Sequence, residues 1–148
     1  MTISISNLSL PTAQLLVSRA IEEARQEFKR PVCVAVCDSQ GFLIALGRAD
    51  GSPVRSVAIC QGKAYSAVRM GVSTGAFLAR VQKENIEVGF FCDPALTALP
   101  GGSVLKNAAG DAIGGIGVSG LLSAEDQVIT DRVAELLAAG KLAAATSR

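Results

Sequence analysis

Histidine is the most informative absence in this sequence, because none occurs among the 148 residues. Without it, catalysis by a Ser-His-Asp or Cys-His arrangement is excluded, and so is a haem iron held by an imidazole. Any general acid or base must then be a carboxylate, a lysine, a tyrosine or a cysteine. The four cysteines show no CxxC spacing, so the sequence predicts no metal site.

Charged residues are scarce as well. They form 18% of the chain, whereas soluble domains usually carry about 25%. The formal net charge is +1, so the composition gives no sign of a nucleic-acid partner. A small domain with so few charges has little polar surface with which to cover itself. We therefore predict a homo-oligomer that buries part of its surface between copies.

Long apolar runs are also missing. No run reaches the roughly 20 residues that a membrane-spanning helix needs. The first seven residues contain neither the basic stretch nor the apolar stretch of a secretory signal. We expect a cytoplasmic protein with no membrane partner, in which the cysteines are reduced thiols.

The remaining pattern predicts one α/β domain over residues 1–148. Both strands of the first predicted hairpin are apolar on both faces, which places helices above and below one antiparallel sheet. Capping residues are expected at Ser9, at Ser52 before Pro53, at Ser73, and in a capping box at Ser123. The expected helices start at these caps, the first two hairpin strands span 32–37 and 42–47, a short strand spans 86–92, and a second hairpin spans 103–106 and 112–118.

A glycine-rich segment matches the GxGxxG dinucleotide fingerprint, Gly115-Ile-Gly-Val-Ser-Gly120. That fingerprint belongs at the start of a βαβ series, and the predicted order of elements here is not βαβ, so we reject a nucleotide site. Two interpretations stay open. Either the glycines allow close backbone approach, or the N–H groups of Ser119, Gly120 and Leu121 hold a carboxylate or phosphate near a helix start.

Several side chains are candidates for chemistry. Between Arg48 and Lys83 the only acid is Asp50, against six basic residues: Arg48, Arg55, Lys63, Arg69, Arg80 and Lys83. This excess either attracts a small anion or forms an ordinary solvated face. Cys92, in a predicted loop-like setting, is a candidate reactive thiol. Lys63 and Tyr65 are candidate proton-transfer groups, although a lysine and a tyrosine in a helix commonly only pack.

The order and spacing of five segments are characteristic when taken together: Val34-Ala-Val-Cys-Asp38, Arg48-Ala-Asp-Gly51, Lys63-Ala-Tyr65, Pro100-Gly-Gly102 and Gly114 to Gly120. They resemble the GlcG/HbpS-like family, which also includes the C-terminal domain of PduO-type proteins. The resemblance implies a profilin-like α/β/α sandwich with a central antiparallel sheet, assembled as a multimer. It places a shared site around seven residues: Arg48, Asp50, Lys63, Gly101, Gly102, Ser119 and Gly120.

Members of this family bind or degrade haem, or are associated with corrinoid metabolism. The first functional hypothesis is therefore a small-ligand-binding protein for haem, another tetrapyrrole or a small, carboxylated anion. The alternative is a small catabolic enzyme, a hydrolase, tautomerase or deaminase acting on a carboxylated intermediate. In that enzyme Arg48 and the Ser119 and Gly120 amides would hold the substrate carboxylate. Lys63, Tyr65, a carboxylate side chain or Cys92 would move protons or attack. A third hypothesis is an accessory partner with no ligand of its own.

Overall fold

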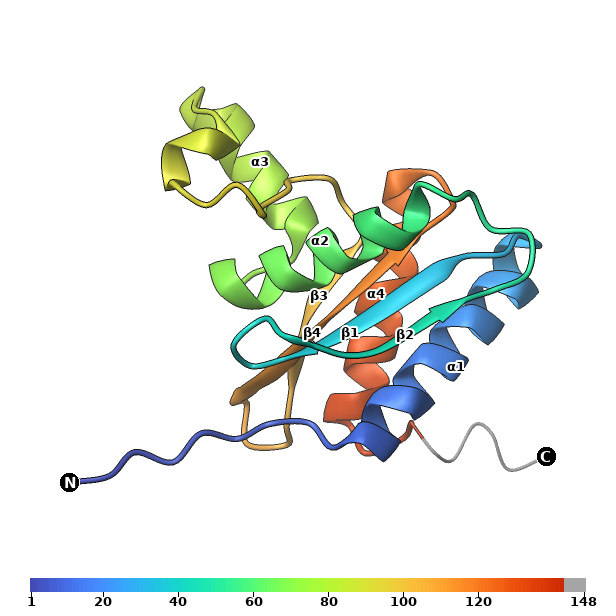
Figure 1. Cartoon of the computed structure of the whole chain (residues 1–148), viewed down its shortest axis with the longest axis horizontal. Helices are drawn as coiled ribbons and strands as arrows, with labels where there is room; N and C mark the ends of the chain where they lie inside the picture. The colour runs from blue at the N-terminus through green and yellow to red at the C-terminus, as the bar shows by residue number, and fades with distance from the viewer. Residues whose placement is uncertain (143–148) are drawn as a thin grey trace.

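The computed structural model describes residues 1–142, which form an antiparallel sheet between two layers of helices (Figure 1). Helices α1 and α4 cover one face of the sheet and α2 lies on the other. This architecture confirms the predicted α/β fold class. The strand order is β2-β1-β4-β3, all antiparallel. The elements are α1 (Leu10–Phe28), β1 (Cys33–Asp38), β2 (Leu43–Arg48), α2 (Ser56–Met70), α3 (Thr74–Glu84), η1 (Val88–Phe91), β3 (Gly102–Lys106), β4 (Ala112–Ser119) and α4 (Ser123–Ala138).

Strand β1 lies inside the sheet and is buried on both faces, as its sequence predicts. Val34 and Val36 pack toward α1 and α4 in the larger core. Cys33, Ala35 and Cys37 pack toward α2 in a second cluster. This period-2 alternation follows from the pleat of the strand. None of the helices within residues 1–142 is long and apolar enough to cross a membrane.

The structure corrects the expectation for β2. Its apolar sequence predicted burial on both faces, but β2 is an edge strand and Leu43 is 51% exposed. Composition cannot separate an apolar edge strand from a central one, because position in the sheet is decided by long-range pairing.

Two predicted helix starts and one predicted strand are also wrong. Helix α2 begins at Ser56 rather than near Pro53, and the Ser52 hydroxyl instead donates to Ala49 O. The cap of α4 is Leu122 rather than Ser123, so the predicted box of Ser123 with Asp126 does not form. The Glu125 carboxylate instead accepts from Leu122 N–H. Residues 86–92 contain the 3-10 turn η1, because Phe91 turns back to pack edge-on against Phe77 of α3.

Candidate functional site

The glycines of β4 determine how closely α2 approaches the sheet. Gly115 and Gly117 alternate along β4 and both face α2. A methyl group at Gly115 would collide with Ala64 O, and one at Gly117 would collide with Cys60 O and Ala64 N. The backbone of α2 therefore rests directly on the strand. Close backbone approach, one of the two interpretations open from the sequence, is what these glycines provide.

The Lys63 side chain of α2 reaches α4, which packs on the other face of the sheet. Its Nζ donates to Asp126 Oδ2 of α4 at 2.9 Å and to Val118 O at 2.8 Å. Lys63 is 0% exposed and Asp126 is 2% exposed. The second oxygen of Asp126 accepts from Leu121 N–H at 3.1 Å. The pair joins α2 to the start of α4.

Burial opposes the charges of this pair. It lowers the pKa of the Lys63 ammonium and raises the pKa of the Asp126 carboxyl, while the attraction between them works against both shifts. Removing two charges from water is costly, and it is compensated only where the hydrogen bonds of both groups are well made. Three hydrogen bonds to backbone and partner meet that condition here.

The loop before β3 closes over the pair. Gly101 has a φ of +127°, and a methyl group on it would meet Lys63 Nζ, Asp126 Cβ and Val118 O. The Gln127 side chain fixes this loop, because its Oε1 accepts from Gly101 N–H at 2.7 Å and its Nε2 donates to Gly102 O at 3.0 Å. The predicted Pro100-Gly-Gly102 segment thus acts by covering Lys63.

A cavity of about 280 Å³ opens beside the pair, and we call it the polar cleft. Its inner wall carries the Lys63–Asp126 pair and two buried hydroxyls, with Ser119 Oγ donating to Ser56 Oγ at 3.1 Å. No side chain accepts a capping hydrogen bond at the start of α4, and Ser123 of its first turn also lines the cleft. The lining residues are Arg55, Ser56, Ile59, Lys63, Leu99, Ser119, Gly120, Leu121, Leu122, Ser123 and Asp126.

The charges of the polar cleft favour an anion. Two cations, Arg55 and Lys63, line it against one carboxylate, Asp126. Lys63 and Asp126 neutralise each other in their ion pair, which leaves Arg55 as the uncompensated charge. Arg55 is exposed at the mouth, and no acid within residues 1–142 forms an ion pair with it. The free guanidinium of Arg55 is therefore the group at the mouth that an anion would pair with.

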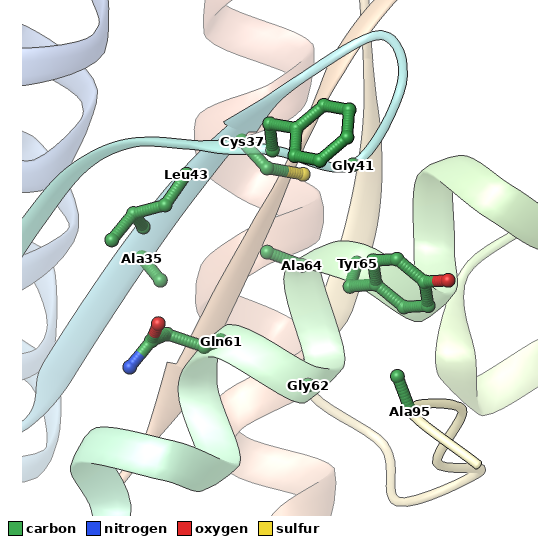
Figure 2. A pocket seen from close by; sticks show the side chains of 10 residues that line it. Ala35, Cys37, Gly41, Leu43, Gln61, Gly62, Ala64, Tyr65 and Ala95 are labelled. Atoms are coloured by element: carbon green, nitrogen blue, oxygen red, sulfur yellow. The ribbon is translucent and has the colours of Figure 1, made fainter.

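A second cavity lies on the other side of α2, between that helix and the β1–β2 turn, and we call it the apolar pocket (Figure 2). It measures about 260 Å³, and small residues such as Ala35, Gly62 and Ala64 create the space. The Tyr65 ring forms one wall. Its hydroxyl points away from Cys37 and Leu43, donates to Asp93 Oδ2 at 2.6 Å and accepts from Arg69 Nε at 3.1 Å.

The predicted site residues therefore separate into groups. Lys63, Gly101, Gly102, Ser119 and Gly120 meet at the polar cleft or at the pair behind it. Tyr65 lies at the apolar pocket. The other predicted residues lie elsewhere.

Cys92 is exposed after η1, as expected for its loop. Arg48 of β2 and Ser119 of β4 both pair with Cys33 of β1. Two strand spacings therefore separate their backbones, about 10 Å. Asp50 lies in a hollow formed with Arg25, Lys29 and Arg30. Neither Arg48 nor Asp50 lines the polar cleft.

Sequence reasoning did not assign Arg55, Ser56, Ser123 or Asp126 to a site. The sequence did indicate Arg55, since it belongs to the basic stretch between Arg48 and Lys83 that could attract an anion. Ser123 and Asp126 were interpreted as helix-capping residues, which hid their position at a cavity. Ser56 was assigned no role at a site, because a serine near a helix start is ordinary.

Comparisons with known proteins agree on the family. The model of a family described as haem-degrading protein HbpS-like matches residues 8–135. A double mutant of HbpS from Streptomyces reticuli is similar, with 28% identity, coverage of 93% of this chain and 90% of that chain, and a TM-score of 0.80. A PduOC–haem complex is 26% identical over 87% of this chain and 94% of that chain, with a TM-score of 0.76.

The ORFY protein of Klebsiella pneumoniae shares the fold, with 24% identity, coverage of 93% of this chain and 95% of that chain, and a TM-score of 0.83. A search of curated proteins finds no match.

Proposed function

Since the chain belongs to the HbpS-like family, we propose that it is a small-ligand-binding protein whose polar cleft holds a carboxylate group of the ligand. The observation that supports this most directly is Arg55, an unpaired guanidinium at the mouth of a cavity that also contains three serine hydroxyls. An arginine binds a carboxylate through two parallel N–H donors. Serine hydroxyls and free amides supply the shorter-range donors.

The rim of the cleft adds a second property to the ligand. Leu99 is 43% exposed and Leu122 is 66% exposed, and both line the mouth. When the carboxylate of a ligand lies in the cleft, the rest of the ligand therefore contacts an apolar rim. This arrangement suits an amphipathic acid: either a tetrapyrrole with carboxylate side chains, such as haem, or a smaller acid with a hydrocarbon body.

The residues present do not fit an axially ligated haem iron. No histidine, cysteine, methionine or tyrosine, the usual protein ligands to haem iron, lines the polar cleft. A lysine amine could also serve as a ligand, but Lys63 Nζ is already bonded to Asp126 and Val118 O. In the apolar pocket, burial raises the pKa of Cys37 to about 12, which keeps the thiol protonated. The Tyr65 hydroxyl in that pocket already donates a hydrogen bond to Asp93. If haem binds in the cleft, we therefore propose that the protein recognises its carboxylate side chains rather than its iron.

An enzymatic role has less support in the geometry. Of the three predicted reactive groups, only Lys63 is at the polar cleft, and it is held by Asp126 and Val118 O. Tyr65 and Cys92 lie elsewhere. No arrangement of nucleophile and base at the cleft favours catalysis over binding.

The experiment is a titration of the purified protein with three probes: hemin, octanoate and octanol. We expect octanoate to bind and octanol, which lacks the carboxylate, to bind at least tenfold more weakly. Arg55→Gln should weaken octanoate binding about tenfold or more, the equivalent of the about 1.5–3 kcal/mol of a hydrogen bond to a charged group. Arg48→Gln, an exposed arginine outside the cleft, is the matched control and should bind as the wild type does.

Saturable hemin binding that Arg55→Gln weakens would identify the tetrapyrrole class as a ligand. Octanoate binding without hemin binding would identify the smaller acids. Equal binding of octanoate and octanol, or a loss with Arg48→Gln alone, would contradict the assignment of this cleft.

A further inference from the structure

The apolar pocket is a second cavity that the proposed function does not use. It lies on the α2 side of the sheet, between α2, β1 and the β1–β2 turn (Figure 2), whereas the polar cleft opens beside the start of α4. Half of its lining residues are alanine or glycine: Ala35, Gly41, Gly62, Ala64 and Ala95. The space therefore comes from small side chains on several different elements.

The walls of the apolar pocket are held in place by hydrogen bonds. The Tyr65 hydroxyl donates to Asp93 Oδ2 at 2.6 Å, and Asp93 Oδ1 accepts from Ala95 N–H at 3.0 Å. Two residues further along, Thr97 N–H donates to Ser66 Oγ of α2 at 2.8 Å. The ring and the loop beside it are thus bonded to the same helix. A pocket with fixed walls needs little ordering when a ligand enters.

The apolar pocket excludes an ion. Of the described residues that line it, none carries a formal charge. Asp93 and Arg69 bond to the Tyr65 hydroxyl, which points away from Cys37 and Leu43, and neither lines the cavity. Burial raises the pKa of the Cys37 thiol to about 12, so this wall is neutral as well. An ion here would lose its hydration and gain no opposite charge, so the ligand must be uncharged.

The lining and the volume favour one aromatic ring. Two aromatic side chains, Phe42 and Tyr65, line the cavity, and Phe42 is 73% exposed and therefore free to cover a ligand. Aromatic rings pair favourably in offset or edge-on arrangements. The cavity measures about 260 Å³, and an apolar cavity of about 150 Å³ already holds benzene. The space suits a single ring with small substituents.

Gln61 of α2 supplies the polar contact. Its Nε2 donates to Val57 O at 3.0 Å, while its Oε1 accepts no hydrogen bond from any residue between 1 and 142. Figure 2 shows this amide across the pocket from the Tyr65 ring. An acceptor without a partner at the wall of an apolar cavity favours a ligand that brings one donor.

We propose that the apolar pocket is a second binding site, which takes one uncharged aromatic ring that bears a hydrogen-bond donor, with phenol as the simplest example. The ring lies against Tyr65 and Phe42, and its hydroxyl donates to Gln61 Oε1. This site shares no lining residue with the polar cleft. Either site can therefore fail its test without the other.

The test is a titration at neutral pH with phenol, anisole and benzoate, followed by amide chemical shifts. Phenol is uncharged there, because a phenolic hydroxyl has a pKa of about 10. Phenol should give saturable shifts at Gly41 and Gly62. Anisole lacks the donor and should bind about fivefold more weakly at these amides, as expected for one neutral hydrogen bond. Benzoate carries a charge and should bind there at least tenfold more weakly than phenol.

Two variants locate the ligand. Gln61→Leu removes the acceptor at similar size, so it should weaken phenol binding about fivefold and leave anisole binding unchanged. Gly62→Leu should block both ligands by filling the pocket. A side chain fits at Gly62, since the nearest atom to an added methyl group is Thr97 Cγ2 at 3.6 Å. Arg55→Gln, at the polar cleft, is the control and should bind phenol as the wild type does.

Three results would overturn the proposal. They are the absence of saturable phenol shifts at Gly41 and Gly62, equal binding of phenol and anisole, and an equal loss of both ligands in Gln61→Leu. The comparison of the three ligands uses the wild type alone, so it decides the matter even if a variant fails to fold.

Discussion

Lys63 of α2 and Asp126 of α4 are joined by a 2.9 Å ion pair that is buried beneath Gly101. The two residues are far apart in the chain, and the pair connects the helical layers on opposite faces of the sheet. It also forms the inner wall of the polar cleft. The stability of the fold and the shape of the proposed binding site are therefore determined by the same contact.

Lys63→Met should be strongly destabilising. The substitution keeps the length of the side chain but leaves the Asp126 carboxylate buried without its partner, which typically costs about 3–5 kcal/mol. Urea denaturation measures this loss. The double variant Lys63→Met/Asp126→Leu, which removes both charges, should recover most of it. A single variant that loses less than about 1 kcal/mol would show that the pair contributes little.

The loss in Lys63→Met should also depend on pH. Burial raises the pKa of Asp126 in the folded state above the 3.8 of a free carboxyl. Without Lys63, burial and the nearby Glu125 charge still raise this pKa, and only the backbone bond from Leu121 lowers it. A raised folded pKa means that the folded state binds the proton more tightly, so the penalty grows as pH rises. Denaturation at pH 5 and pH 8 should show a smaller loss at pH 5. A larger loss at pH 5 would contradict the assigned direction.

Gly117→Ala should destabilise the protein because the added methyl group meets Cys60 O and Ala64 N of α2. Overpacking of this kind costs about 1–3 kcal/mol. The control is Gly89→Ala, since nothing lies within 4 Å of a methyl group at that position. Thermal unfolding of both variants is the measurement. Equal melting temperatures would mean that α2 does not rest on β4 as described.

Iodoacetamide should label one cysteine of the native protein at pH 8. Cys92 is exposed, whereas Cys33, Cys37 and Cys60 are buried. Burial raises the pKa of the Cys37 and Cys60 thiols to about 12, so about one molecule in 10⁴ carries the reactive thiolate at either site at this pH. Mass spectrometry should find a single adduct at Cys92, and adducts on all four after unfolding. Rapid native labelling of Cys37 would refute the buried setting.

The sequence predicted the architecture because the architecture depends on local patterns. The double alternation of β1, the cap at Ser9 and the cap at Ser73 all act within a few residues, and each is present in the structure. The prediction of a strand at residues 86–92 was wrong because a short apolar run fits a strand and a helical turn equally well. The edge position of β2 could not be predicted, since pairing order is a long-range property.

The candidate site was predicted only in part for the same reason. The glycines and Lys63 stand out in the sequence, and the fold brings them together at the polar cleft. Asp126 and Ser123 do not stand out, because helix capping explains them fully. Their second position, at a cavity shared with Arg55, arises only when β4 returns the chain beside α2. The predicted roles of Arg48, Asp50, Tyr65 and Cys92 stay predictions, as does the cytoplasmic location.

The most direct test of the central claim is a map of amide chemical shifts during titration with octanoate. A carboxylate in the polar cleft should shift the amides of Ser119 to Ser123 and Ser56 by the largest amounts, with saturation. It should leave Gly41 and Gly62 at the apolar pocket unchanged, and Arg55→Gln should suppress the response. Saturable shifts that gather at the apolar pocket, or that persist undiminished in Arg55→Gln, would contradict the account.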